Sequence, residues 1–245
     1  MKALILPAIF LISLAGCKST RVPDEPVKTS LQANSSGAGL QVVLEFTRGS
    51  EHNHPSFVFW AEDKEGNYLQ TLFITQAVGT GRYEHGDASG TAWKPGEVRR
   101  PASLPYWAHR RGILAEDGLY VPSPQNPVAD ACTGATPAGD FTLTTRFDRE
   151  PPRTFRLLFE LNQTWDWNEF WTNNKYPDDD EYKTSCQPAL VYMAEVDLDN
   201  PQDSYLMQVI GHSHYSGKTG ELFTDLSTMT TALEIAEKLV IRLPE

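Results

Sequence analysis

Histidines at alternate positions are the first residues of this chain whose types and spacing could do chemistry. They occur as two pairs, His52 with His54 and His212 with His214. Residues i and i+2 of an extended strand point to the same side, so each pair could offer two imidazoles to a copper or zinc ion. Nothing in the sequence indicates that the two pairs lie close together in space, and the first pair precedes Pro55 in an expected loop. Metal binding is therefore the third of three functional hypotheses.

Tryptophans gather beside acidic residues further along the chain. Trp165, Trp167 and Trp171 lie within seven residues, and the acidic run 178–181 follows. Exposed aromatic rings beside carboxylates and amides can hold a sugar or a flavin ring by stacking and hydrogen bonding. With Trp107, these tryptophans are candidates for a ligand-binding surface. The structural alternative is that some of them belong to the core and that the acidic run is a solvated loop or a weak Ca²⁺ contact.

The segment DACTGAT, residues 130–136, ends in a threonine hydroxyl that could act as a nucleophile. It resembles the flavinylation motif, at which a periplasmic flavin transferase uses FAD to esterify FMN to the last threonine. The resemblance implies covalent FMN on Thr136, with an acidic residue ahead of it. It also implies a run of small residues that lets the transferase approach the backbone. The implied cofactor-binding residues are Asp130, Thr133, Gly134, Ala135 and Thr136. The alternative is a turn before the next strand, since Thr-Gly and Pro-Ala-Gly-Asp are good turn formers.

A second resemblance covers residues 40–243. Runs such as FVFWAEDKEGNYLQTLFIT and VIGHSHYSGKTGELFTDLSTMTTA are similar to those of an uncharacterised family of predicted periplasmic proteins. Members of that family occur beside flavin transferases and heme- or flavin-linked membrane reductases. The resemblance implies an extracytoplasmic redox setting, with a flavin transferase and an envelope redox protein as partners.

The N-terminus carries an expected export signal. Lys2 precedes an apolar run, residues 3–14, that is too short to span a bilayer. The run ends in LAGC, which resembles the bacterial lipobox, so residues 1–16 are expected to be removed and Cys17 to be acylated. Several acyl chains on one cysteine anchor a protein stably. Lys18 after the cysteine matches the sorting pattern for the outer membrane of a Gram-negative cell.

The net charge limits the possible partners, and the cysteines indicate the expected redox state. The formal net charge is −11, which is the wrong sign for a protein that neutralises nucleic-acid phosphates. With Cys17 acylated, Cys132 and Cys186 remain in an oxidising compartment, and a disulfide between them is the expected state. A redox-active pair is the alternative, although neither cysteine lies in a CxxC motif.

Established catalytic motifs are absent from the sequence. It contains no Gly-x-Ser-x-Gly, His-Glu-x-x-His, P-loop or dinucleotide fingerprint, so a hydrolase is not supported. The hypotheses that remain are a covalent FMN carrier in extracytoplasmic electron transfer, a non-catalytic ligand- or partner-binding surface lipoprotein, and a metal-binding protein. A redox carrier or binding protein fits the sequence better than an enzyme.

Short strand-like runs must position these residues. In residues 190–198, apolar side chains alternate with more polar ones, as in a half-buried strand. About eight such runs and one short helical candidate, residues 230–238, predict an all-β, immunoglobulin-like β-sandwich with long loops and at most one short helix. A barrel is the alternative. The expected domains are the signal peptide 1–16, a flexible tether 17–38 and one sandwich domain 39–245. The long connection 79–126 is expected to pack over one end of the sandwich beside residues 165–171.

Overall fold

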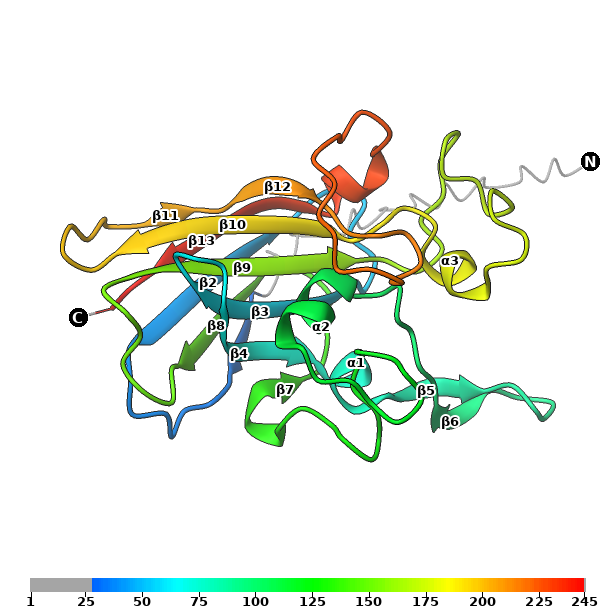
Figure 1. Cartoon of the computed structure of the whole chain (residues 1–245), viewed down its shortest axis with the longest axis horizontal. Helices are drawn as coiled ribbons and strands as arrows, with labels where there is room; N and C mark the ends of the chain where they lie inside the picture. The colour runs from blue at the N-terminus through cyan, green and yellow to red at the C-terminus, as the bar shows by residue number, and fades with distance from the viewer. Residues whose placement is uncertain (1–27, 245) are drawn as a thin grey trace, which may run out of the picture.

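Two open β-sheets pack against each other in the computed structural model, which describes residues 28–244 (Figure 1). The first sheet has the order β1 (Thr29–Gln32), β8 (Phe141–Arg146), β2 (Gln41–Arg48), β13 (Ala236–Arg242) and β11 (Tyr205–Leu206). The second has the order β12 (Gln208–His212), β10 (Leu190–Asp197), β9 (Thr154–Asn162), β3 (Ser56–Asp63), β4 (Tyr68–Thr75) and β7 (Thr133–Gly134). The predicted all-β sandwich is confirmed.

Short elements lie outside the two sheets. They are the hairpin of β5 (Arg82–Asp87) and β6 (Lys94–Glu97), the helices α1 (Gln76–Thr80), α2 (Pro105–Arg111) and α3 (Asp180–Ser185), and 3-10 turns at Asp130–Cys132 and Thr231–Glu234. The described part of the chain thus has three short helices where the sequence predicts at most one. The predicted helix at 230–238 is instead a 3-10 turn that leads into β13.

Alternating apolar residues fill the space between the sheets. Along β2, Val42, Leu44 and Phe46 are buried while their neighbours are partly exposed. The Phe46 ring stacks on Phe141 at 4.7 Å between centroids, and Phe141 meets Phe57 of the other sheet at 5.1 Å. These aromatic contacts fix how the two sheets face each other.

A second hydrophobic layer covers the outer face of the second sheet. Strand β3 is buried on both faces, with Val58 and Trp60 directed outwards. Leu104 and Trp107 of the long connection pack against them, and α2 lies over this face (Figure 1). The connection 79–126 therefore covers a sheet face, and its aromatic content is explained by that burial.

The fold begins earlier than the sequence predicts. Residues 29–32, assigned to the tether, form β1 and pair in parallel with β8, and Ala33 and Asn34 are buried. The expected signal peptide, Cys17 and the first part of the tether lie outside the described residues. Within residues 28–244, no helix is long and apolar enough to cross a membrane.

Candidate ligand-binding site

A pocket of about 840 Å³ lies where several connections meet at the end of the second sheet. Its walls come from α1, from the β5–β6 hairpin, from the segment 134–136, and from loops that carry His54 and Trp165. Ligand pockets commonly have volumes of roughly 300–1,000 Å³. The pocket therefore unites Gly134, Ala135 and Thr136 with one predicted aromatic residue and one predicted histidine.

Pairing with distant strands positions Thr136. Strand β7, just before it, pairs in parallel with the end of β4. The Asn34 N–H donates to the carbonyl of Ala131 at 2.7 Å, and the Thr29 N–H donates to the carbonyl of Asp140 at 2.9 Å. The segment that bears Thr136 is thus held on both sides, and Thr136 itself is half-buried on the pocket wall.

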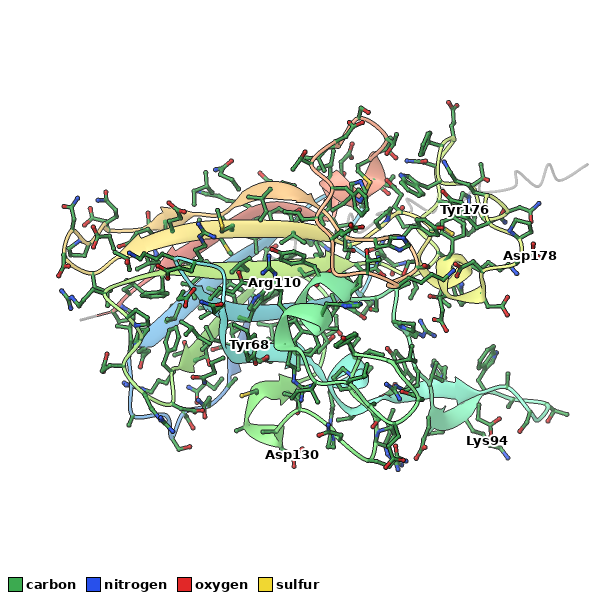
Figure 2. All side chains as sticks on the ribbon, viewed as in Figure 1. Tyr68, Lys94, Arg110, Asp130, Tyr176 and Asp178 are labelled. Atoms are coloured by element: carbon green, nitrogen blue, oxygen red, sulfur yellow. The ribbon has the colours of Figure 1, made fainter. Side chains whose placement is uncertain are left out.

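Packing explains part of the 130–136 motif. A Cβ on Gly134 would lie 2.8 Å from a ring carbon of the buried Phe73, so only glycine fits there without a shift. The Thr133 hydroxyl donates to the carbonyl of Asp130 at 3.2 Å and closes the 3-10 turn. Asp130 is exposed and points away from the sheet beside β7 (Figure 2). It does not line the pocket, so within the motif only residues 134–136 do.

Trp165 stands on the pocket wall in an unusual backbone conformation. Its φ of 58° is left-handed, which costs a bulky residue about 1–2 kcal/mol. Its N–H donates to the carbonyl of Thr184 at 3.1 Å, and the next N–H, of Asp166, donates to Ser185 at 3.1 Å. The Asp166 carboxylate accepts a hydrogen bond from the Thr231 hydroxyl. These contacts hold the strained backbone and keep the indole 63% exposed at the pocket.

Tyr83 and Arg100 form a cation–π pair on the pocket lining. The guanidinium carbon of Arg100 lies 4.6 Å from the centre of the Tyr83 ring. Burial raises the pKa of Tyr83 to about 12 despite the nearby arginine charge. The Tyr83 hydroxyl and Arg100 Nε are both buried and have no hydrogen-bond partner within residues 28–244. The pair therefore places one positive charge and one aromatic ring on the same part of the pocket lining.

Two of the four candidate surface tryptophans are buried instead. Trp107 is 0% exposed and donates from Nε1 to the Thr71 hydroxyl at 2.9 Å. Trp171 is 6% exposed and donates to the Thr228 hydroxyl at 3.1 Å. Both predictions are wrong because these indoles fill hydrophobic clusters and have internal partners for their N–H groups. Trp167 is exposed, but it does not line the pocket.

The histidine pairs do not form a metal site. His52 packs edge-on against Phe46 at 5.6 Å, His212 stacks on Phe223 at 5.4 Å, and His214 stacks on Tyr215 at 4.4 Å. Burial lowers the pKa of His52 and of His214. No group of three or more possible metal-binding side chains occurs in the part of the chain that the structure describes. Three of the four imidazoles that the sequence suggests as ligands are in aromatic contacts, and the fourth, His54, lines the pocket.

Cys132 and Cys186 are free, buried thiols in the structure. Cys132 lies in the layer on the outer face of the second sheet, whereas Cys186 lies in the core between the sheets. Because the two belong to different hydrophobic clusters, the predicted disulfide is not formed. Burial raises the pKa of each thiol to about 11, which keeps both protonated and poorly nucleophilic.

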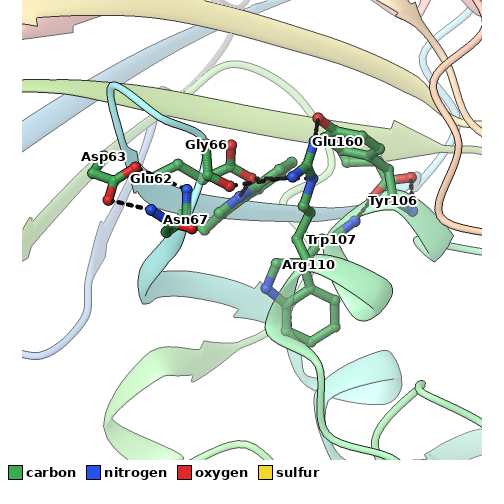
Figure 3. A network of polar contacts seen from close by, with 9 residues as sticks. Glu62, Asp63, Gly66, Asn67, Tyr106, Trp107, Arg110 and Glu160 are labelled. Carbon is green, nitrogen blue, oxygen red and sulfur yellow. Dashed lines mark hydrogen bonds and ion pairs between the residues drawn. The ribbon is translucent and has the colours of Figure 1, made fainter.

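Two buried carboxylates lie under α2 (Figure 3). Glu160 accepts hydrogen bonds from the N–H groups of Tyr106 and Trp107 at 3.1 and 2.8 Å, so it caps the helix. Glu62 lies 3.8 Å from Nε of Arg110. Burial raises the pKa of both carboxyls, that of Glu160 to about 8. Neither lines the pocket, and both have structural partners.

The sequence did not single out most of the pocket residues as site candidates, and the chemically notable ones among them are Tyr83, Trp93 and Arg100. All three lie in the connection 79–126, whose length and aromatic content were the available signal. Comparison of the chain with protein-family models, with curated proteins and with solved structures finds no match in any of the three.

Proposed function

We propose that this protein is an exported, lipid-anchored carrier of covalent FMN that exchanges electrons at the cell envelope. One observation carries the proposal: Thr136, which the motif resemblance makes the acceptor, lies on the wall of a pocket large enough for a cofactor. A turn at a strand entry has no need of such a pocket. The exposed indoles of Trp93 and Trp165 on the same walls suit a planar ring.

The attachment chemistry requires only the hydroxyl of Thr136 from this chain. Its oxygen bonds to the phosphorus of the FMN half of FAD, the bond to AMP breaks, and AMP leaves with the bonding electrons. The hydroxyl proton passes to a base of the transferase. Bound in this way, FMN supplies reversible electron transfer, while the protein holds and orients it. A covalent bond removes the need for a large nucleotide-binding fold.

The entry point of the chain supports an envelope role. Strand β1 begins at Thr29, which bonds to Asp140, four residues after Thr136. With an anchor on Cys17, the eleven residues 18–28 would separate the lipid from the fold. Eleven residues span at most about 40 Å. The pocket would then lie close to the membrane, where a membrane-bound redox partner could reach the flavin.

The test is co-expression of the full chain with a flavin transferase, followed by intact mass and in-gel flavin fluorescence. Wild type should gain the mass of one FMN phosphoester, and Thr136→Ala should not. Thr164→Ala is the matched control, because Thr164 is another threonine that lines the pocket. Wild type without the added mass, or Thr136→Ala with it, would refute the proposal. Cys17→Ser separately tests the anchor, since this variant should accumulate as unprocessed precursor.

A second candidate is a non-catalytic lipoprotein that binds a ligand or partner without covalent attachment. The pocket favours it as well, because Trp93, Trp165 and Tyr83 line it independently of any modification. This candidate predicts that Thr136→Ala retains the function of the protein in the envelope. The covalent carrier predicts its loss.

A further inference from the structure

Two residues of the pocket lining, Tyr83 and Arg100, form a pair with a positive charge at the pocket. The hydroxyl of Tyr83 and Nε of Arg100 are buried, and neither has a partner within residues 28–244. The guanidinium of Arg100 lies over the tyrosine ring, so the two side chains form one unit. Because the pKa of Tyr83 is about 12, its hydroxyl remains a donor at any physiological pH. Arg100 is partly exposed on the pocket lining, so its positive charge is available to a ligand that offers acceptor oxygens.

The same pocket carries two exposed indoles from segments far apart in the sequence. Trp93 lies in the turn of the β5–β6 hairpin and Trp165 lies in the loop after β9, and they are 61% and 63% exposed. Large exposed apolar groups that line one pocket are typical of binding sites. The left-handed backbone of Trp165 is a second sign, since strain of this kind persists where the surrounding structure enforces it and clusters at ligand sites.

We infer that this pocket binds the isoalloxazine ring of the flavin, with Trp93 and Trp165 stacking on the ring and the positive charge of Arg100 facing its carbonyl oxygens. The identity of the ring rests on the proposed function. The lining itself, with two exposed indoles and one arginine, suits a planar ring that carries acceptor oxygens. Arg100 has a further effect, because a positive charge at the ring carbonyls favours the electron-rich reduced ring and raises its reduction potential.

The experiment compares flavinylated wild type with Trp93→Leu, Trp165→Leu and Arg100→Gln. Trp167→Leu is the matched control, because Trp167 is exposed to a similar degree and lies outside the pocket. Intact mass reports covalent loading, while flavin fluorescence and visible circular dichroism of the native protein report ring docking.

Wild type should show several-fold quenched fluorescence and an induced dichroism band. Trp93→Leu and Trp165→Leu should recover fluorescence several-fold at unchanged FMN mass, and Trp167→Leu should match wild type. Arg100→Gln should have a more negative midpoint potential.

The outcomes separate this inference from the proposed function. Flavinylated wild type with fluorescence as bright as free FMN and no induced dichroism would overturn ring docking and leave the carrier function intact. If wild type carries no FMN, the carrier function fails, and Thr136→Ala is then titrated with free FMN. Saturable quenching that Trp93→Leu or Trp165→Leu abolishes, and Trp167→Leu does not, would support the pocket assignment by itself. No saturable binding would overturn it.

Discussion

Substitution of Gly134 by alanine separates the packing role of the motif glycine from any role in recognition by a transferase. The new Cβ would lie 2.8 and 2.9 Å from two ring carbons of Phe73, whereas carbon atoms prefer about 3.5–4.0 Å. Phe73 is buried and stacked on Phe57 at 5.3 Å, so its ring has little room to withdraw. Overpacking of this kind costs about 1–3 kcal/mol. Alanine also lowers the conformational entropy of the unfolded chain relative to glycine, which offsets roughly 0.5 kcal/mol of this loss of stability.

Gly134→Ala should therefore lower the free energy of unfolding by about 0.5–2.5 kcal/mol, and Tm by roughly 1–10 °C for a domain of this size. Gly139→Ala is the control, because its Cβ would meet only Arg48 Cδ, at an ordinary 3.7 Å. Urea unfolding and thermal melting of both variants measure the difference. If Gly134→Ala stays within about 0.5 kcal/mol of Gly139→Ala, the packing explanation is wrong. The glycine of the motif would then not be explained by packing in the folded protein, and recognition by a transferase would be the remaining explanation.

Three further predictions concern buried groups. Burial raises the pKa of Glu160 from 4.5 to about 8. Between these two pH values the folded state holds a proton on Glu160 that the unfolded state has lost. The free energy of unfolding should therefore fall as pH rises from about 5 to 8. Glu160→Gln should flatten that fall, by at most about 1.4 kcal/mol per pH unit in urea unfolding, and an unchanged slope would contradict the assignment. Trp107→Ala should cost about 3–5 kcal/mol in unfolding free energy and Trp167→Ala less than about 1, because the first indole is fully buried and the second exposed; equal losses would show the burial to be wrong. Cys132 and Cys186 should resist alkylation in native protein and both react after unfolding without reductant; a linked peptide in a non-reducing map would restore the disulfide.

The strands could be predicted because their signals are local. The alternation in residues 190–198 correctly indicates β10, with Tyr192, Ala194 and Val196 directed into the core. The burial of Trp107 depends instead on contacts with strand β3, which is far from it in the sequence. The continuous apolar run 57–61 does carry a clue, because a strand that is apolar on both faces must be covered on both. The connection 79–126 supplies that cover, and its tryptophan therefore belongs to the core.

The candidate site shows the same division between local and long-range information. The hydroxyl of Thr136 could be singled out from the residues immediately before it, yet the polar sequence 28–38 gave no sign that it contributes to the site. Its strand β1 is only four residues long and pairs in parallel with β8, a contact that no local pattern encodes. That pairing and the Asn34 contact clamp the segment that carries Thr136. The pocket residues Tyr83, Trp93 and Arg100 are far from Thr136 in the sequence, and the fold brings them to the same pocket. The acceptor is therefore a local feature of the sequence, and the site around it is a product of the fold.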